Sequence, residues 1–82
     1  MTELTPLHSL APGSSGKVRR LLSQGSERRR MLDLGLINDT TVKVLRRSPS
    51  GDPVAYEIRR AVIALRSEEA SKILVECMNT GI

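Results

Sequence analysis

Hydrophobic and polar residues alternate along several short stretches of this chain. In Thr41–Arg47 and Val54–Arg59, apolar side chains recur at alternate positions, which is the period of a half-buried β-strand. Ala61–Leu65 and Val75–Cys77 are expected to be two further strands. Lys17–Leu22 alternates imperfectly, and such a break is typical of a strand with a bulge or a strong twist. The pattern therefore predicts five short strands.

Two short helices are expected between these strands. Ser26 can cap a helix over Glu27–Leu34, and Gly35 suits the left-handed conformation that commonly ends a helix. The leucine after that glycine would then fold back over the helix. Ser67 can cap a second short helix, because two glutamates follow it in the first turn, where a carboxylate suits the positive end of the helix.

Turn-forming residues separate these elements. Gly13–Gly16, Asn38–Thr40 and Pro49–Pro53 are expected to be loops or turns. Arg59–Arg60 is expected to turn the chain between two strands, although it lacks the usual glycine. No internal repeat or low-complexity segment interrupts the series.

The whole chain, residues 1–82, is expected to form one domain, because it is too short for two. Residues 1–12 are interpreted as an extended lead-in that could pack at one end, and residues 78–82 as a frayed tail. The core is expected over about residues 7–77. Five strands in an open sheet would leave two hydrophobic edges, and a curled sheet avoids this. The predicted fold class is mainly β: a small SH3-like barrel of about five strands with two short helices.

Composition restricts the setting of this domain. Tyr56 is the only aromatic residue, so the core has to be built from aliphatic side chains. Cys77 is the only cysteine, which excludes an internal disulfide and favours a reducing, cytosolic environment. Met1–Pro6 lacks the features of a signal peptide, and the longest apolar run, Ala61–Leu65, is too short to cross a bilayer. We therefore expect a cytoplasmic protein.

No group of residues indicates catalysis or tight metal binding. Gly13–Lys17 suggests a phosphate-binding loop, but it lacks the first glycine and the final hydroxyl residue of that motif. His8, interpreted as a surface residue, and Cys77 are the two soft metal ligands, whereas a tight site needs three or four. A nucleophile would also need a base, and His8 is the only histidine. We expect no enzymatic activity, no cofactor and no tight metal site; weak metal binding by carboxylates stays open.

Positive charge is the main surface feature, since 13 lysines and arginines oppose 9 aspartates and glutamates. Arginine predominates, and its planar guanidinium suits carboxylate and phosphate partners, so an acidic protein face, nucleic acid and anionic lipid are all compatible with the charge. Arginine is also enriched at protein interfaces. Nucleic-acid binding is disfavoured, because the basic residues are not interleaved with aromatic residues on which bases could stack. The predicted partner-binding residues are Arg28, Arg29, Arg30, Arg46, Arg47, Arg59 and Arg60. For the first three, a solvated helix face is an equally simple interpretation.

Four short motifs, in this order and at this spacing, resemble the ferrous-iron transport protein A (FeoA) family. They are Arg30–Leu36, Gly51–Pro53, Ala64–Arg66 and Glu69–Ala70, and the likeness covers about residues 7–76. The motifs lie at helix ends and turns, so they are interpreted as structural rather than as binding residues. Many family members have Pro-Gly in place of Asn38-Asp39 and glycine in place of Arg60, which affects the geometry of two turns.

The resemblance implies an SH3-like barrel and an accessory role in ferrous-iron uptake. The implied partner is a FeoB-type ferrous-iron permease, which has a cytosolic GTP-binding domain and would recruit this protein to the inner face of the membrane. Docking on that permease is the leading hypothesis. The alternative is an SH3-like regulatory domain of the iron-dependent repressor type. An exposed barrel edge would also allow two copies of the chain to pair weakly.

Overall fold

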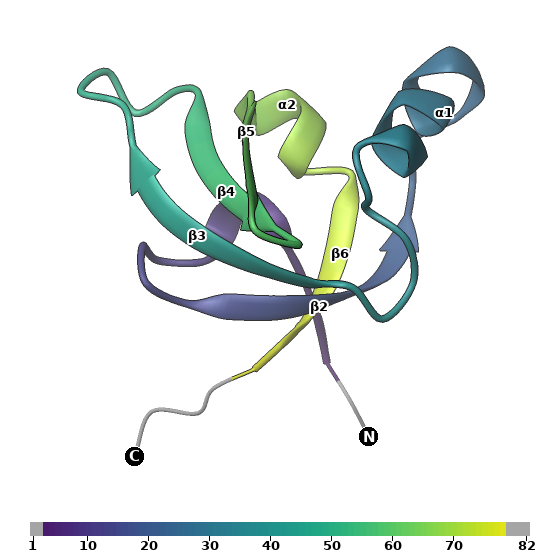
Figure 1. The fold of residues 1–82 in the computed structure, drawn as a ribbon, viewed down its shortest axis with the longest axis horizontal. Helices are drawn as coiled ribbons and strands as arrows, with labels where there is room; N and C mark the ends of the chain where they lie inside the picture. The colour runs from purple at the N-terminus through teal and green to yellow at the C-terminus, as the bar shows by residue number, and fades with distance from the viewer. Residues whose placement is uncertain (1–2, 79–82) are drawn as a thin grey trace.

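Six antiparallel strands form one curved sheet in the computed structural model, which describes residues 3–78 (Figure 1). The elements are β1 (Leu4–Pro6), η1 (Leu7–Ser9), β2 (Ser15–Leu21), α1 (Gly25–Asp33), β3 (Thr41–Arg47), β4 (Val54–Ile58), β5 (Ala61–Leu65), α2 (Ser67–Ala70) and β6 (Ile73–Cys77). Across the sheet the order is β1-β6-β2-β3-β4-β5, so β1 and β5 are the edge strands. The predicted mainly β, SH3-like fold with two short helices is confirmed. The strands number six rather than five, and the curved sheet is not closed.

The described part of the N-terminal segment, expected to be an extended lead-in that packs at one end, contains a strand and a short 3₁₀ helix instead of irregular structure. β1 pairs with β6, with Thr5 opposite Val75. The η1 turn then brings Leu7 into the core, where it is fully buried, and Leu10 is buried beside it. A strand of three residues is too short to show a period, which is why alternation does not predict it.

β2 begins earlier than predicted, because Gly16 belongs to the strand rather than to a loop. A Cβ atom at Gly16 would lie 2.8 Å from Val75 Cγ2 on β6, so the glycine allows the two strands to approach each other closely. The predicted irregularity is confirmed as a shift in the β2–β6 register between Val18 and Arg20.

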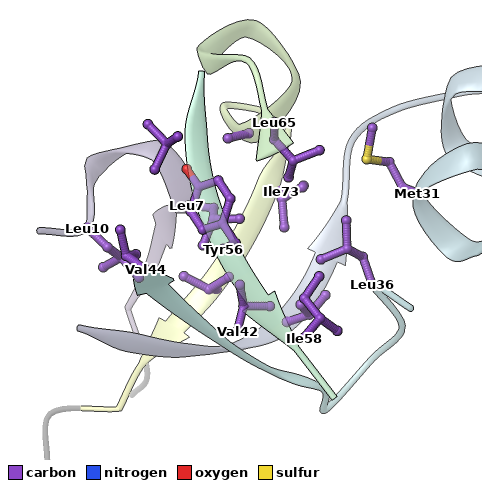
Figure 2. Packing of buried hydrophobic residues seen from close by; sticks show 14 residues of the cluster. Leu7, Leu10, Met31, Leu36, Val42, Val44, Tyr56, Ile58, Leu65 and Ile73 are labelled. Atoms are coloured by element: carbon purple, nitrogen blue, oxygen red, sulfur yellow. The ribbon is translucent and has the colours of Figure 1, made fainter. Parts of the chain in front are cut away.

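The core is aliphatic and surrounds Tyr56, as the composition predicts (Figure 2). Val42 and Val44 on β3, and Tyr56 and Ile58 on β4, are almost completely buried, in strict alternation with more exposed neighbours. The buried apolar residues are Leu7, Leu10, Val18, Met31, Leu36, Val42, Val44, Val54, Tyr56, Ile58, Leu65, Ala70, Ile73 and Val75. They come from η1, both helices and every strand except β1, so the thin core ties both helices to the sheet.

α1 ends in the glycine cap that the sequence predicts. Gly35 has φ +102°, in the left-handed region, and its N–H donates to Leu32 O at 3.0 Å. The N–H of Leu36 donates to Met31 O, also at 3.0 Å. These two bonds form a Schellman motif, which folds Leu36 back toward Met31. Both side chains are fully buried where α1 meets the sheet (Figure 2).

The start of α1 differs from the prediction. The helix begins at Gly25, and its N-cap is Gln24, which makes no capping hydrogen bond with its side chain. Gly25 has φ +63°, so the chain enters the helix through a left-handed residue. Ser26 therefore lies inside the first turn, two positions beyond the N-cap, and the prediction that it caps the helix is wrong.

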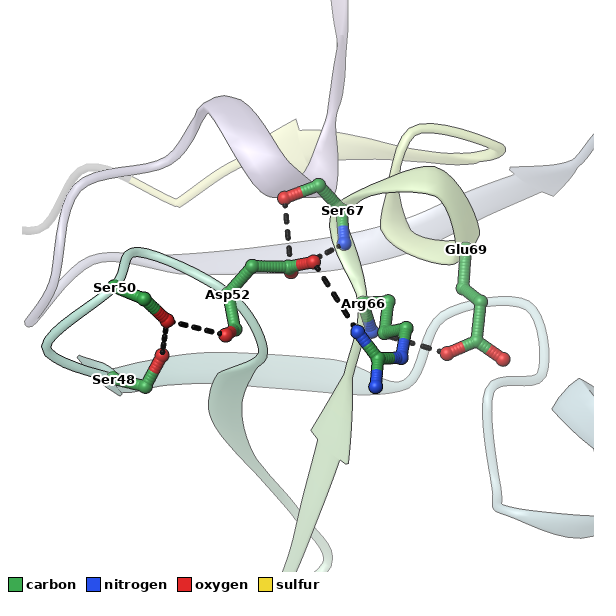
Figure 3. Close-up of polar contacts among 6 residues, drawn as sticks. All are labelled: Ser48, Ser50, Asp52, Arg66, Ser67 and Glu69. Carbon is green, nitrogen blue, oxygen red and sulfur yellow. Dashed lines mark hydrogen bonds and ion pairs between the residues drawn. The ribbon is translucent and has the colours of Figure 1, made fainter.

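α2 is capped from a neighbouring turn and not by its own serine. Ser67 is the first helical residue, and its N–H and Oγ both donate to Asp52 Oδ1, at 2.8 and 3.1 Å (Figure 3). Glu69 Oε1 accepts the backbone N–H of Arg66 at 3.0 Å. The prediction of Ser67 as the cap is wrong, because the folded β3–β4 turn brings the carboxylate of Asp52 to the end of the helix.

The C-terminal strand is longer than predicted. β6 begins at Ile73, because α2 ends after a single turn at Ala70. Met78 follows the strand, and its N–H donates to Ser15 O at 2.9 Å, so backbone pairing continues into the segment that was expected to fray. The rest of that expected tail, residues 79–82, lies outside the described residues.

Candidate docking surface

The seven arginines predicted to bind a partner lie in three separate places. Arg28, Arg29 and Arg30 are on α1, Arg46 and Arg47 end β3, and Arg59 and Arg60 form the β4–β5 turn. α1 and the end of β3 stand at opposite ends of the long axis of the molecule (Figure 1). The seven side chains therefore do not form one continuous surface, and each group has to be considered with its own neighbours.

One α1 arginine is paired with a carboxylate of α2. Arg30 forms an ion pair with Glu69, and Lys72 Nζ lies 3.1 Å from Glu27 Oε1, which adds a second ion pair between α1 and the segment after α2. The hydrogen bond from the backbone N–H of Arg66 lowers the pKa of Glu69; partial burial opposes this effect, and Arg30 reinforces it. These contacts connect α1 to the rest of the molecule.

The other two α1 arginines differ from each other. Arg28 Nη1 donates to the backbone carbonyl of Leu21 on β2 at 3.3 Å, so this side chain lies along the junction between helix and sheet. Arg29 is exposed and forms no ion pair or side-chain hydrogen bond within residues 3–78. Of the three, only Arg29 is therefore both exposed and unpaired within residues 3–78, as expected of a residue that binds a partner protein.

Two arginines form the whole of the β4–β5 turn. Arg59 and Arg60 have φ +50° and +72°, which makes a type I′ turn, a turn that favours asparagine and glycine. Both residues are exposed, and neither forms an ion pair within residues 3–78. A left-handed conformation costs a non-glycine residue about 1–2 kcal/mol. Local strain of this kind concentrates at functional sites.

The end of β3 lies beside an apolar groove. A bulge between Val44 and Arg46 sets the last two residues of β3 opposite the first two of β4. There, Arg46 and Arg47 line a groove of about 470 Å³. The apolar part of its lining includes Pro49, Pro53, Ala55 and Ala64. This groove extends to β5, the edge strand of the sheet.

The two arginines at the end of β3 have different surroundings. Arg47 Nη2 donates to Leu10 O at 3.3 Å and is thereby fixed to the N-terminal segment. Burial raises the pKa of the nearby Tyr56 phenol, an effect that the positive charge of Arg47 partly offsets. Arg46 forms no ion pair or side-chain hydrogen bond within the described part of the chain. Arg47 is therefore partly structural, whereas Arg46 is free to contact another molecule.

Residues that the sequence analysis missed lie on β5, beside these arginines. Val62 is 64% exposed, and Ala64 is exposed at the groove. We refer to Arg46, Arg59, Arg60, Val62 and Ala64 as the hairpin surface. A sequence signal for it exists: the charge-free run Ala61–Leu65 is flanked by arginines on both sides. The apolar character of the run indicates a strand, but it does not show that one side of the strand is open.

The residues considered for catalysis or metal binding are not brought together. The last three residues of Gly13–Lys17 already belong to β2, whereas a phosphate-binding loop would lead into a helix. His8 lies half-buried on η1, and Cys77 is exposed at the end of β6. Residues 3–78 contain no group of three or more metal-ligating side chains. None of the helices in that range is long and apolar enough to span a bilayer.

The architecture is that of a small SH3-like domain whose exposed features are charged and apolar surfaces. Comparison with known proteins identifies the family. Residues 5–77 match the FeoA domain, and the chain belongs to this family. The match begins within β1, at residue 5, so most of the segment interpreted from the sequence as a lead-in is part of the family's domain.

Three known proteins illustrate the likeness. A protein of Porphyromonas gingivalis (strain ATCC BAA-308 / W83), described as an Fe(2+) transport protein A/Fe(2+) transporter FeoB fusion protein, is 34% identical over 75 residues; the match covers 92% of this chain but only 9% of that protein. The structure of an FeoA-like protein from Clostridium acetobutylicum has a TM-score of 0.89 at 30% identity and covers 100% of this chain and 95% of its own. Zinc-complexed FeoA from Stenotrophomonas maltophilia, described as an SH3 domain protein, has a TM-score of 0.77 at 25% identity over 93% of this chain and 89% of its own.

The same fold occurs in metal-dependent repressors. A manganese-dependent transcriptional repressor has a TM-score of 0.84 at 23% identity, and the match covers 95% of this chain and 44% of the repressor. At this identity the likeness shows the fold alone. This chain and the repressor therefore share an architecture, which is no evidence that they share a role.

Proposed function

We propose that this protein is an accessory protein of ferrous-iron uptake, which binds a FeoB-type permease and regulates it without catalysing a reaction itself. The observation that carries the proposal is the fusion relative, in which an FeoA segment and an FeoB transporter form one polypeptide. Fusion keeps two parts at a high effective concentration, which is useful where the separate parts bind each other. Membership in the FeoA family over nearly the whole chain supports the same partner.

The proposed place of action is the cytoplasm, at the inner face of the membrane. The GTP-binding domain of the permease would be reached there by this protein, in which no helix within residues 3–78 is long and apolar enough to span a bilayer. In this proposal the protein acts through surface contact, so it requires no cofactor. Regulation would then follow from a change in the nucleotide cycle or in transport when the complex forms.

The proposed contact residues are the arginines named from the sequence, Arg28, Arg29, Arg30, Arg46, Arg47, Arg59 and Arg60. Their surroundings support different roles within that set. Arg46, Arg59 and Arg60 are free of ion pairs within residues 3–78 and belong to the hairpin surface. Guanidinium groups in this situation suit an acidic face of the partner, where they would mainly increase the association rate and orient the complex.

A binding titration tests this proposal. The protein is added to the isolated GTP-binding domain of the permease and to the full-length permease in lipid discs, over a series of salt concentrations. We expect saturable binding that weakens as salt rises, because exposed charges are screened. GTP hydrolysis and iron uptake, measured with and without the protein, report the regulatory effect. Absence of binding to both forms of the permease at every salt concentration would refute the proposal.

Charge-reversal variants identify the surface. The triple variant Arg46→Glu/Arg59→Glu/Arg60→Glu should weaken binding at least about tenfold, since it replaces attraction by repulsion at three positions. Arg20→Glu is the matched control, because Arg20 is exposed on β2, away from the hairpin surface. Each of the three substitutions is also made singly. If Arg20→Glu weakens binding as much as one of these single variants, binding depends on net charge alone.

A further inference from the structure

The two edge strands of the sheet differ in how they are protected. β1 has three residues and ends at Pro6, whose nitrogen cannot donate a hydrogen bond, and the chain then turns into η1. β5 is the five-residue run Ala61–Leu65, which contains neither a charge nor a proline. The unpaired backbone groups of an edge strand can pair with a strand of another molecule. Proteins usually prevent this by a very short edge strand, a charged residue, a proline, or a helix or loop that covers the edge. Within residues 3–78, no strand lies beyond β5.

The backbone of β5 has free hydrogen-bonding groups on its outer side. A two-residue hairpin turn is closed by a hydrogen-bonded pair, here Ile58 with Ala61, and such pairs alternate along an antiparallel ladder. Ile63 is therefore hydrogen-bonded to β4, whereas the N–H and C=O groups of Val62 and Ala64 point away from it. Neither residue forms a hydrogen bond with another element within residues 3–78. Two donors and two acceptors thus lie along an open edge.

The side chains at these two positions leave room for an additional strand. Val62 is largely exposed, and Ala64 is small and exposed. Ala64 also lines the groove of about 470 Å³ that runs past Ala55 toward Pro49 and Pro53. Every second side chain of an added strand would lie on the same face of the sheet as Val62 and Ala64. There it would cover apolar surface that is now in contact with solvent.

Positive charge stands at both ends of the open edge. Arg59 and Arg60 precede β5, and Arg66 follows it. Arg66 is 3.9 Å from Asp52 Oδ2, at the limit of an ion pair, and 66% of its side chain is exposed. A segment lying along β5 would have its two ends beside these arginines, so carboxylates at both ends would be favoured.

A second copy of the chain does not fit this charge pattern. If two β5 strands paired antiparallel about Ile63, Arg60 of one copy would lie opposite Arg66 of the other at each end of the pair. Like charges directly opposite each other destabilise a strand pair. The net charge of +4 on each copy adds a general repulsion. The weak self-pairing expected from a free barrel edge is thus opposed by the arginines that flank this edge.

We infer that β5 is a docking strand, which binds an extended segment of a partner protein that is apolar in its middle and acidic at both ends. The segment adds a seventh strand to the sheet, with main-chain hydrogen bonds to Val62 and Ala64 and with its carboxylates beside Arg60 and Arg66. Identification of the partner as the permease rests on the proposed function, whereas the edge and its chemistry do not depend on it.

Amide hydrogen exchange of the full chain tests this inference. The probe is a synthetic peptide of alternating valine and threonine with glutamates at both ends, and the control peptide has lysines there. In the free protein, the amides of Val62 and Ala64 should exchange fast and that of Ile63 slowly. Saturation with the glutamate-ended peptide should slow exchange at Val62 and Ala64 and leave Ile63 unchanged. Absence of binding, or protection at other sites instead, would overturn the inference, as would protection that rises with the protein's own concentration.

A proline at the edge separates backbone pairing from simple apolar contact. Val62→Pro removes an outward N–H that β4 does not use, and proline is tolerated in such an edge position. It should weaken binding of the glutamate-ended peptide about tenfold, as expected for one lost hydrogen bond. Val62→Thr is the matched control, which keeps the N–H and should bind like the wild type. Equal binding by both variants would overturn the inference.

If Val62→Pro does not fold, a charge swap replaces it. Arg60→Glu/Arg66→Glu should reverse the preference of the protein, so that the lysine-ended peptide binds more tightly than the glutamate-ended one. An unchanged preference would overturn the inference, because the charges at the ends of the edge would then have no part in recognition.

The permease itself distinguishes the two proposals. If its GTP-binding domain binds the protein and slows exchange at Val62 and Ala64, both are supported. If it binds with these amides unprotected, the docking-strand inference fails and the proposed function stands. If neither form of the permease binds while the peptide does, the proposed function fails and the docking strand stands.

Discussion

At the α1 end of the molecule, two of the three arginines contact other parts of the same chain, whereas at the β4–β5 hairpin both arginines extend into solvent. Arg30 pairs with Glu69, and Arg28 donates to a backbone carbonyl of β2. Arg59 and Arg60, by contrast, occupy a left-handed turn and form no ion pair within residues 3–78. Both groups are runs of adjacent arginines in the sequence, so the difference between them comes from the surfaces that folding places beside each run.

The two groups of arginines should therefore differ in their effects, one on the stability of the fold and the other on binding to a partner. Arginines that are paired inside the fold contribute to its stability, and their loss should appear in the free energy of unfolding. Arginines in a strained and unpaired turn contribute little or nothing to stability, and their loss should appear in binding. Paired substitutions at the two ends of the molecule therefore test whether the comparison is correct.

The largest difference is expected between Leu36→Ala and Val62→Ala. Leu36 is fully buried in the cap that ends α1, whereas Val62 on the hairpin surface is mostly exposed. Leu36→Ala should lower the free energy of unfolding by about 2–5 kcal/mol, since it removes buried volume. Val62→Ala should change it by about 0.5 kcal/mol or less. Denaturant titrations followed by circular dichroism measure both values. Similar losses for the two variants would contradict the comparison.

Opposite effects are expected at two left-handed positions. Gly35, with φ +102°, has Ile58 Cγ2 3.4 Å from the position of an added Cβ, so Gly35→Ala should destabilise the protein by about 1–2 kcal/mol. Arg60, with φ +72°, is already strained, and Arg60→Gly should stabilise the protein by up to about 1 kcal/mol. Thermal unfolding of the two variants gives the signs. A loss at both positions would show that Arg60 has a structural contribution of its own.

The contact of Glu69 with Arg66 and Arg30 should depend on pH. Because the pKa of Glu69 is lower in the folded than in the unfolded state, its stabilisation is present above the unfolded pKa and is lost as pH falls through the folded pKa. Glu69→Gln keeps an oxygen that accepts the backbone N–H of Arg66 but removes the charge, so it should destabilise the protein by about 0.5–1 kcal/mol at neutral pH. The difference from the wild type should shrink in acid. The exposed Glu68→Gln is the control, and a pH-independent difference for Glu69→Gln would contradict the ionic explanation.

The smallest effect is expected from single arginine truncations. Arg30→Ala removes a surface ion pair and should lower the free energy of unfolding by about 0.5 kcal/mol, without affecting the response to the acidic peptide. Arg59→Ala should leave stability unchanged within error and should weaken peptide binding. Unfolding and binding measured on the same two preparations provide the test. A reversed pattern would assign the docking role to α1 instead.

Local signals in the sequence predicted much of the fold. The alternation in β3 and β4, the break in β2 and the glycine cap of α1 each depend on residues close together in the chain. The expected left-handed Gly35 is confirmed, because a helix end needs only its own backbone geometry to specify it. The turn at Arg59–Arg60 was also predictable from the two apolar strands that flank it.

Features that depend on distant contacts could not be predicted in the same way. β1 is a strand because β6, some 70 residues later in the chain, supplies its hydrogen bonds. α2 is capped by Asp52, 15 residues away, so its own Ser67 was a misleading signal. The sequence showed that the candidate site residues are arginines and where they lie in the chain. It did not show that the fold separates them into three places.

Local pattern was thus enough to specify strands, one helix cap, an aliphatic core and an excess of arginine, since these follow from propensity, periodicity and charge. The assembled fold was needed to show which arginines are paired, and which strand has an open side with arginines at both ends. The reason is physical: periodicity reports whether a side chain faces the core, whereas a free sheet edge is defined by the strand that is missing beside it. Contacts between distant segments are therefore what make one arginine structural and leave another exposed.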